Sequence, residues 1–66
     1  MRRKLARGTI AGRIANEDII KGERVVDDGM GGVFHQYNDY EKVFGIALKS
    51  SKKGQPVMVR VTGERN

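Results

Sequence analysis

The sequence predicts a small all-β protein: a single-domain β-barrel or β-sandwich-like fold of about five to six short strands, with a flexible basic N-terminal arm. A chain of 66 residues has room for one domain. Its apolar runs are short, rich in β-branched residues and bounded by glycines and acids, which favours strands. No segment shows the apolar period of a helix. We place the arm at residues 1–13 and the β domain at residues 14–66.

The strands expected before residue 42 are short and are separated by glycine turns. Residues 9–14 alternate weakly, with Ile10 and Ile14 on one face, which predicts an edge strand. Asp28-Gly29 and Gly31-Gly32 are strong turn signals. In chain order we expect the edge strand, a turn at Lys21-Gly22, a strand that begins at Val25-Val26, the glycine-rich turn, and a strand from Val33 to Tyr37.

The stretch KVFGIALKSSKKGQPVMVRVTG, residues 42–63, predicts a β-hairpin. Its first run, Val43 to Leu48, is nearly all apolar, as in a strand that is buried on both faces. Gly45 within that run indicates a close backbone approach or a bulge, and Pro56 suits the start of the last strand because it lacks an N–H donor. The hairpin is expected to supply most of the core through Val43, Phe44, Ile46, Leu48, Val57, Val59 and Val61.

Little in the sequence suits catalysis or metal binding. The chain has no cysteine and one histidine, His35, so it can form neither a disulfide nor a thiolate zinc site. The glycines of DGMGGV precede a β-branched strand rather than a helix, which favours a turn over a phosphate-binding loop. Asp27 and Asp28 lack the ligand spacing of a calcium loop, and Ser50 and Ser51 have no evident base. We therefore expect no enzymatic activity, no cofactor and no metal.

Positive charge is concentrated at the N-terminus. Residues 1–13 carry five basic residues and no acid, whereas residues 14–66 carry eight basic and eight acidic residues. The net charge of +5 therefore lies entirely on the arm, and the body is neutral by formal count. Three interpretations are open: a solvated tail, a tail that docks on an acidic protein surface, and a small nucleic-acid-binding β-barrel.

Nucleic-acid binding has a clear physical basis among these alternatives. Clusters of lysine and arginine bind phosphate backbones and release counterions, and single-strand binders add exposed aromatic side chains for base stacking. Phe34 and Phe44 are expected in the core, so only Tyr37 and Tyr40 are left to stack on bases. This thin aromatic set on a neutral body counts against nucleic acid as the partner.

The spacing of several short motifs resembles that of the small capsid cement, or head decoration, proteins of tailed bacteriophages. That family shows an early G-x-x-V element, a strand ending in Gly-x-Ala-Leu, a polar loop with glycine, and a valine-rich last strand that closes with glycine. The matching positions in this chain are Gly22 to Val25, Gly45 to Leu48, Gly54, and Val57 to Gly63. A β-clip accessory domain that binds protein or sugar is a weaker alternative for the same pattern.

The resemblance implies a non-enzymatic protein that binds the major capsid protein on the outside of a mature phage head and stabilises the head against internal DNA pressure. It also implies a location on the capsid exterior of the virion, and in the host cytoplasm before assembly. The sequence has no apolar run long enough to span a membrane. A monomer and a homo-trimer on the capsid are both open.

The residues expected to contact the capsid lie mainly in the arm. Its basic side chains are expected to pair with acidic capsid groups, and a strand over residues 9–14 is expected to add to an exposed sheet edge of the shell. A second set, on the β domain, would contact either the capsid or another copy of the chain. The arm set is Arg2, Arg3, Lys4, Arg7, Thr9, Ile10 and Arg13, and the second set is Tyr37, Tyr40, Met58 and Arg60.

Overall fold

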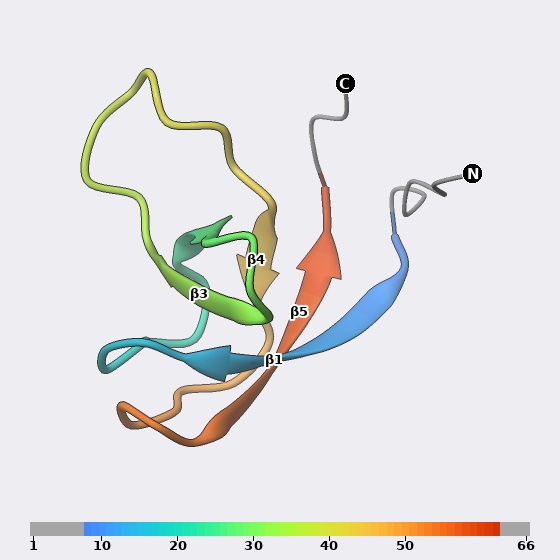
Figure 1. Ribbon diagram of the computed structural model, residues 1–66. Coiled ribbons are helices and arrows are strands. Elements are labelled where there is room, and N and C mark those ends of the chain that lie inside the picture. The colour runs from blue at the N-terminus through green and yellow to red at the C-terminus, as the bar shows by residue number, and fades with distance from the viewer. Residues whose placement is uncertain (1–7, 63–66) are drawn as a thin grey trace.

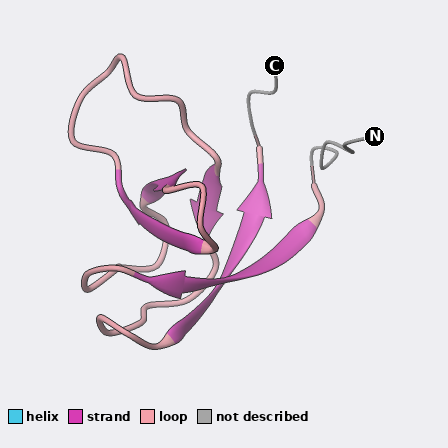
Figure 2. Ribbon diagram, in the orientation of Figure 1, coloured by secondary structure: helices cyan, strands magenta, loops and turns pink. Residues whose placement is uncertain are grey.

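The computed structural model describes residues 8–62 and shows a closed barrel of five strands (Figures 1 and 2). No residue in that range is helical, and the range holds no helix long and apolar enough to cross a membrane. The prediction of a small all-β barrel is confirmed. The strands are β1 (Ile10–Ala15), β2 (Arg24–Asp27), β3 (Gly32–His35), β4 (Gly45–Ala47) and β5 (Pro56–Val61), and their order around the barrel is β1-β3-β2-β4-β5.

β1 closes the barrel by pairing with two strands. It runs antiparallel to β5 along Ile10–Ile14, and parallel to β3 only at Ile14 and Ala15. Residues 10–13 therefore have a strand neighbour on one side alone, whereas Ile14 has one on each side (Figure 1). The expected edge strand is an edge in its first part, and its end is built into the barrel wall.

The barrel begins earlier in the chain than the sequence suggested. Residues 10–13, which we assigned to the arm, lie in β1, and backbone hydrogen bonds to Val61 extend the pairing to residues 8 and 9. The strand is hard to recognise in the sequence because Gly12 interrupts its outward face, and because the charged Arg13 shares the inward side with two alanines. The rest of the arm, residues 1–7, lies outside the described residues.

The interior of the barrel is narrow and is filled by small and β-branched side chains. Along β5 every second side chain is buried, as the alternation of Val57, Val59 and Val61 predicts. Strands of three to six residues enclose little volume, so a few valines and alanines suffice to fill it. The core cluster consists of Ala15, Ile19, Val25, Val33, Ala47, Val57 and Val59, with the partly buried Phe44 packed against it.

β4 differs from the expectation of a strand buried on both faces. It is shorter than predicted and buries Gly45 and Ala47, while Ile46 is half-buried on the outward side. The reason is space: a Cβ at Gly45 would lie 2.2 Å from the Arg60 carbonyl oxygen and 2.6 Å from the Val59 Cγ1 atom. The expected close backbone approach at Gly45 is confirmed, and it admits only small residues on the inner side of β4. Ile46 and Leu48 are consequently not core residues, and Val43 is only half-buried.

The glycine-rich stretch after β2 is a turn, as predicted. Gly29 and Gly31 both have positive φ, at 86° and 94°, which side chains with a Cβ rarely adopt. Asp27 accepts a hydrogen bond from the Gly29 N–H at 3.0 Å, and Asp28 accepts from the N–H groups of Met30 and Gly32 at 2.7 and 3.0 Å. Since carboxylates of the chain itself use these backbone donors, the stretch does not resemble a phosphate-binding loop.

The contact at Gly45 generates a prediction about stability. We expect Gly45→Ala to lower the free energy of unfolding by about 1–3 kcal/mol or to abolish folding, because the new methyl group overpacks against the β5 backbone. For a domain of this size each kcal/mol corresponds to a fall in Tm of about 4–8 °C. Urea and thermal unfolding, followed by circular dichroism, measure both quantities.

Gly12→Ala is the matched control. A Cβ at Gly12 would meet only the Met58 Sδ atom, at 3.8 Å, which is an ordinary contact. We expect this variant to change the stability by less than about 1 kcal/mol, because alanine also loses less conformational entropy on folding than glycine. Equal destabilisation by the two substitutions would show that barrel closure does not depend on the close approach at Gly45.

Candidate partner-binding surface

The barrel interior offers no chemical site. Among residues 8–62 no polar or charged residue is buried as a whole, and no group of three or more histidine, cysteine, aspartate or glutamate residues is placed to hold a metal ion. The interior is occupied by the apolar cluster described above. The side chains available to a ligand or partner therefore lie on the outside of the barrel.

The outward side of β4, β5 and β1 carries an apolar surface, which we call the outer face. The strand register places Ile14 beside Pro56 and Gly12 beside Met58, and the Leu48 N–H donates to the Met58 carbonyl at 2.9 Å on the other side of β5. Three apolar side chains on this side are well exposed: Ile10 at 46%, Ile14 at 45% and Met58 at 43%. The outer face comprises Ile10, Gly12, Ile14, Ile46, Leu48, Pro56 and Met58.

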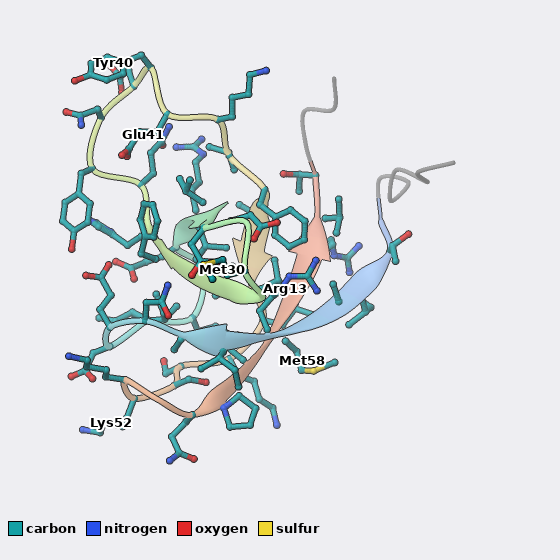
Figure 3. All side chains as sticks on the ribbon, viewed as in Figure 1. Arg13, Met30, Tyr40, Glu41, Lys52 and Met58 are labelled. Carbon is teal, nitrogen blue, oxygen red and sulfur yellow. The ribbon has the colours of Figure 1, made fainter. Side chains whose placement is uncertain are left out.

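Gly12 makes the outer face continuous. Because position 12 has no side chain, the thioether of Met58 lies beside it, within contact distance of where a Cβ would be. Met58 points away from the barrel at the crossing of β1 and β5 (Figure 3), and it occupies the interval between Ile10 and Ile14 along β1. An exposed apolar strip of this kind is typical of a surface that contacts another macromolecule.

Two arginines join the outer face at one end. Arg24 on β2 lies beside Ile46 on β4, Ile46 lies beside Arg60 on β5, and Arg60 lies beside Ile10 on β1. This row alternates cationic and apolar side chains across four strands. Both arginines are exposed, and neither side chain forms a hydrogen bond or an ion pair with another described residue. Their guanidinium groups are therefore free to pair with a carboxylate of a partner.

Arg13 has a different environment. Its guanidinium lies 4.8 Å from the centroid of the Phe44 ring, an arrangement typical of a cation–π contact. Its Nη1 atom donates to the Gly12 carbonyl at 2.9 Å, and its Nε atom is buried without a hydrogen-bond partner. Of the predicted arm contacts within the described residues, Ile10 therefore lies on the outer face, Thr9 is half-buried, and Arg13 packs against the barrel. Arg2, Arg3, Lys4 and Arg7 lie outside the described residues.

The structure separates the second predicted contact set into two places. Met58 and Arg60 lie together on the outward side of β5. Tyr37 and Tyr40 lie in the long connection between β3 and β4, and Figure 3 shows Tyr40 at the tip of that connection, on the far side of the molecule from Met58. The four residues cannot all belong to one small contact.

A group of carboxylates fastens the β3–β4 connection to the barrel. Glu17 accepts hydrogen bonds from the His35 backbone N–H at 2.8 Å and from the Tyr37 hydroxyl. His35 also lies 3.2 Å from a carboxylate oxygen of Glu23 and packs edge-on against the Tyr37 ring. Glu41 accepts from the Tyr37 N–H at 2.7 Å. Residues 17 and 37 are far apart in the sequence, and no local signal predicts that they meet.

These carboxylates illustrate how charge is used across the described chain. Most acids accept hydrogen bonds from backbone N–H groups, as Asp18 does from Lys53, Glu23 from Ile20 and Asp28 from Met30. The described lysines and arginines other than Lys42 form no ion pair with them. The body is neutral by formal count, but the charged groups that are free to meet a partner are predominantly cations.

Comparison of the chain with protein-family models, with curated proteins and with solved structures finds no match in any of the three. What the outer face binds is therefore inferred from the residues of this chain.

The contacts of Glu17 generate a prediction about pH. The pKa of Glu17 is held below its usual value, chiefly by the hydrogen bond from the Tyr37 hydroxyl. The backbone N–H and the ring of His35 lower it further. A carboxyl group with a lowered folded-state pKa contributes stability above its unfolded pKa and loses that contribution as the pH falls through the folded value. We expect the NMR signals and amide protection of residues 35–38 to change in that acidic range.

Glu17→Gln is the matched variant, since it keeps the shape of the side chain and removes the charge. We expect faster amide exchange at residues 35–38 at neutral pH and no acid transition there, with the β1–β5 ladder unchanged. Asp28 also has a lowered pKa, caused first by its hydrogen bond from Asn16, and its signals at the other turn provide an internal reference. If the acid transition at residues 35–38 is undiminished in the variant, the titrating group is not Glu17.

Proposed function

We propose that this protein is a non-enzymatic capsid decoration protein, which binds the major capsid protein on the outside of a mature phage head and stabilises the head against internal DNA pressure. The observation that carries the proposal is the outer face: an exposed apolar strip with two unpaired arginines on a closed barrel. It is supported by the motif spacing that resembles cement proteins. In the described part of the chain no polar or charged residue is buried as a whole.

The physical basis of the stabilisation is linkage. A protein that binds the assembled, expanded shell and not its dissociated subunits stabilises the shell by RT ln(1 + [L]/Kd) for each site. A phage head repeats the same surface many times, so a modest affinity at each site adds up over the particle. A rigid barrel suits this role because little conformational freedom is lost when it binds.

The outer face and the arm divide the binding between them. Apolar contact at Ile10, Ile14 and Met58 supplies most of the affinity through burial of exposed side chains. The arginines of the outer face and the basic residues of segment 1–7 orient the protein and accelerate its association with an acidic surface. In the sequence this segment directly precedes Gly8 and the first strand of the barrel.

Strand addition is a second mode of contact for the same surface. Residues 10–13 of β1 have no strand neighbour on the side away from β5. An extended capsid segment that pairs there would gain backbone hydrogen bonds and place its side chains beside Ile10 and Gly12. The Gly12 carbonyl accepts a bond from Arg13, so the segment would have to displace that side chain at one point.

Co-sedimentation with purified mature heads tests the proposal. We expect the wild-type protein to pellet with the heads at micromolar concentration, and Met58→Lys to bind about tenfold more weakly, because it places a charge at the centre of the apolar strip. Tyr40→Ser is the control, since it removes an exposed aromatic residue far from Met58 (Figure 3). A wild-type protein that stays in the supernatant would refute the proposal.

Deletion of residues 1–7 tests the role of the arm. A longer deletion to residue 13 would remove most of β1, so the shorter one is the informative variant. We expect an unchanged circular dichroism spectrum, weaker binding to heads, and a smaller dependence of the binding on salt, because fewer ion pairs form with the capsid. Unchanged affinity and salt dependence would show that segment 1–7 is not part of the contact.

A mobility-shift assay with single- and double-stranded DNA and RNA distinguishes the nucleic-acid alternative. That alternative requires a shift that weakens steeply with salt. Tyr37, an expected stacking residue, lies beside the carboxylates of Glu17 and Glu41, which repel phosphate. We therefore expect no shift at physiological salt.

A further inference from the structure

A groove of about 610 Å³ lies at the end of the barrel next to the outer face. Its two walls are the connection between β1 and β2 and the connection between β4 and β5. Ile19 is buried at its base, and Ile20 is 61% exposed. Pro56, which also lines the groove, pairs with Ile14 on the outer face, so a partner seated on that face can reach into the groove.

Hydrogen bonds between the walls hold the groove in shape. Ile19 and Ser51 exchange two backbone hydrogen bonds of 2.8 and 2.9 Å, the Lys21 N–H donates to the Ser50 hydroxyl at 2.9 Å, and the Lys53 N–H donates to Asp18 at 2.9 Å. The groove is thus present before any partner binds, and its walls lose little freedom on binding.

The charged groups that line the groove favour an acidic ligand. Lys49 and Lys52 are exposed, and their side chains form no hydrogen bond or ion pair with another described residue. Figure 3 shows Lys52 extending from this end of the barrel. Asp18, the one carboxylate among the lining residues, accepts the Lys53 N–H. The groove therefore combines apolar side chains with two unpaired ammonium groups.

We propose that this groove binds an extended acidic segment of the capsid protein, with one apolar side chain against Ile20 and Pro56 and flanking carboxylates at Lys49 and Lys52. The inference rests on the proposed function and names the chemistry of the partner at this place. An extended segment can lie along the groove that the two hydrogen-bonded loops line. Its carboxylates would complement the two lysines, and its apolar side chain the apolar lining.

Charge reversal of single lysines tests the inference in the head-binding assay. We expect Lys49→Glu and Lys52→Glu each to weaken binding about tenfold or more, because each replaces an attraction by a repulsion. Lys53→Glu is the matched control: it makes the same change in the same loop, at a position that does not line the groove. At 0.15 M salt the screening length is about 8 Å, so we expect the control to stay within about twofold of the wild type. If all three variants bind like the wild type, the groove inference is overturned and the decoration proposal stands.

A second measurement does not need the capsid. The probe is a synthetic peptide of alternating glutamate and leucine, titrated into the labelled full-length protein by NMR, with a glutamine–leucine peptide as control. We expect the acidic peptide alone to shift the signals of Ile20, Lys49 and Lys52, and Lys52→Glu to abolish the shifts. If the acidic peptide shifts these signals but the wild-type protein does not pellet with heads, the decoration proposal is refuted, and binding of acidic segments in the groove is supported. The groove inference would be overturned if the peptide caused no shifts or shifted signals elsewhere. It would also be overturned if analytical ultracentrifugation showed dimers that depend on these lysines.

Discussion

The close approach of β4 to β5 at Gly45 is the constraint on which the rest of the structure depends. With the Arg60 carbonyl so near, the inner side of β4 holds only glycine and alanine, and the barrel closes around a narrow core of valines and alanines. The bulkier Ile46 must then point outward, beside Arg60. The tight closure at Gly45 thus accounts for the contribution of β4 to the apolar outer face.

The charged side chains are divided in a similar way: most of the described carboxylates bind the protein's own backbone, and most of the described cations are exposed to solvent. Carboxylates such as Asp18 and Asp28 satisfy backbone donors in turns that would otherwise be unpaired, which is a structural requirement for loops with few regular hydrogen bonds. The side chains of Arg24, Arg60 and Lys52, by contrast, form no hydrogen bond or ion pair with another described residue. A body that is neutral by formal count, residues 14–66, can therefore present a cationic surface, because most of its carboxylates accept hydrogen bonds from its own backbone.

These two features together carry the proposed binding role. Among residues 8–62 no polar or charged residue is buried as a whole, so the polar side chains reach the surface of the barrel. Binding to a large rigid assembly needs an exposed apolar surface with free charges around it, held on a body that does not deform. The outer face and the groove adjoin each other at Pro56, so one partner surface can contact both.

The sequence by itself determined the strand content, the glycine turns and the inward alternation of Val57, Val59 and Val61, because strand periodicity and positive-φ turns are local properties of the chain. It also indicated the tight contact at Gly45. Only the tertiary structure decided which side of β4 faces the core, where β1 begins, and that Glu17 meets Tyr37, because these depend on which strands become neighbours. The outer face was beyond sequence reasoning for the same reason: Ile10, Met58 and Ile46 come from three strands and become one surface only through the register that barrel closure imposes.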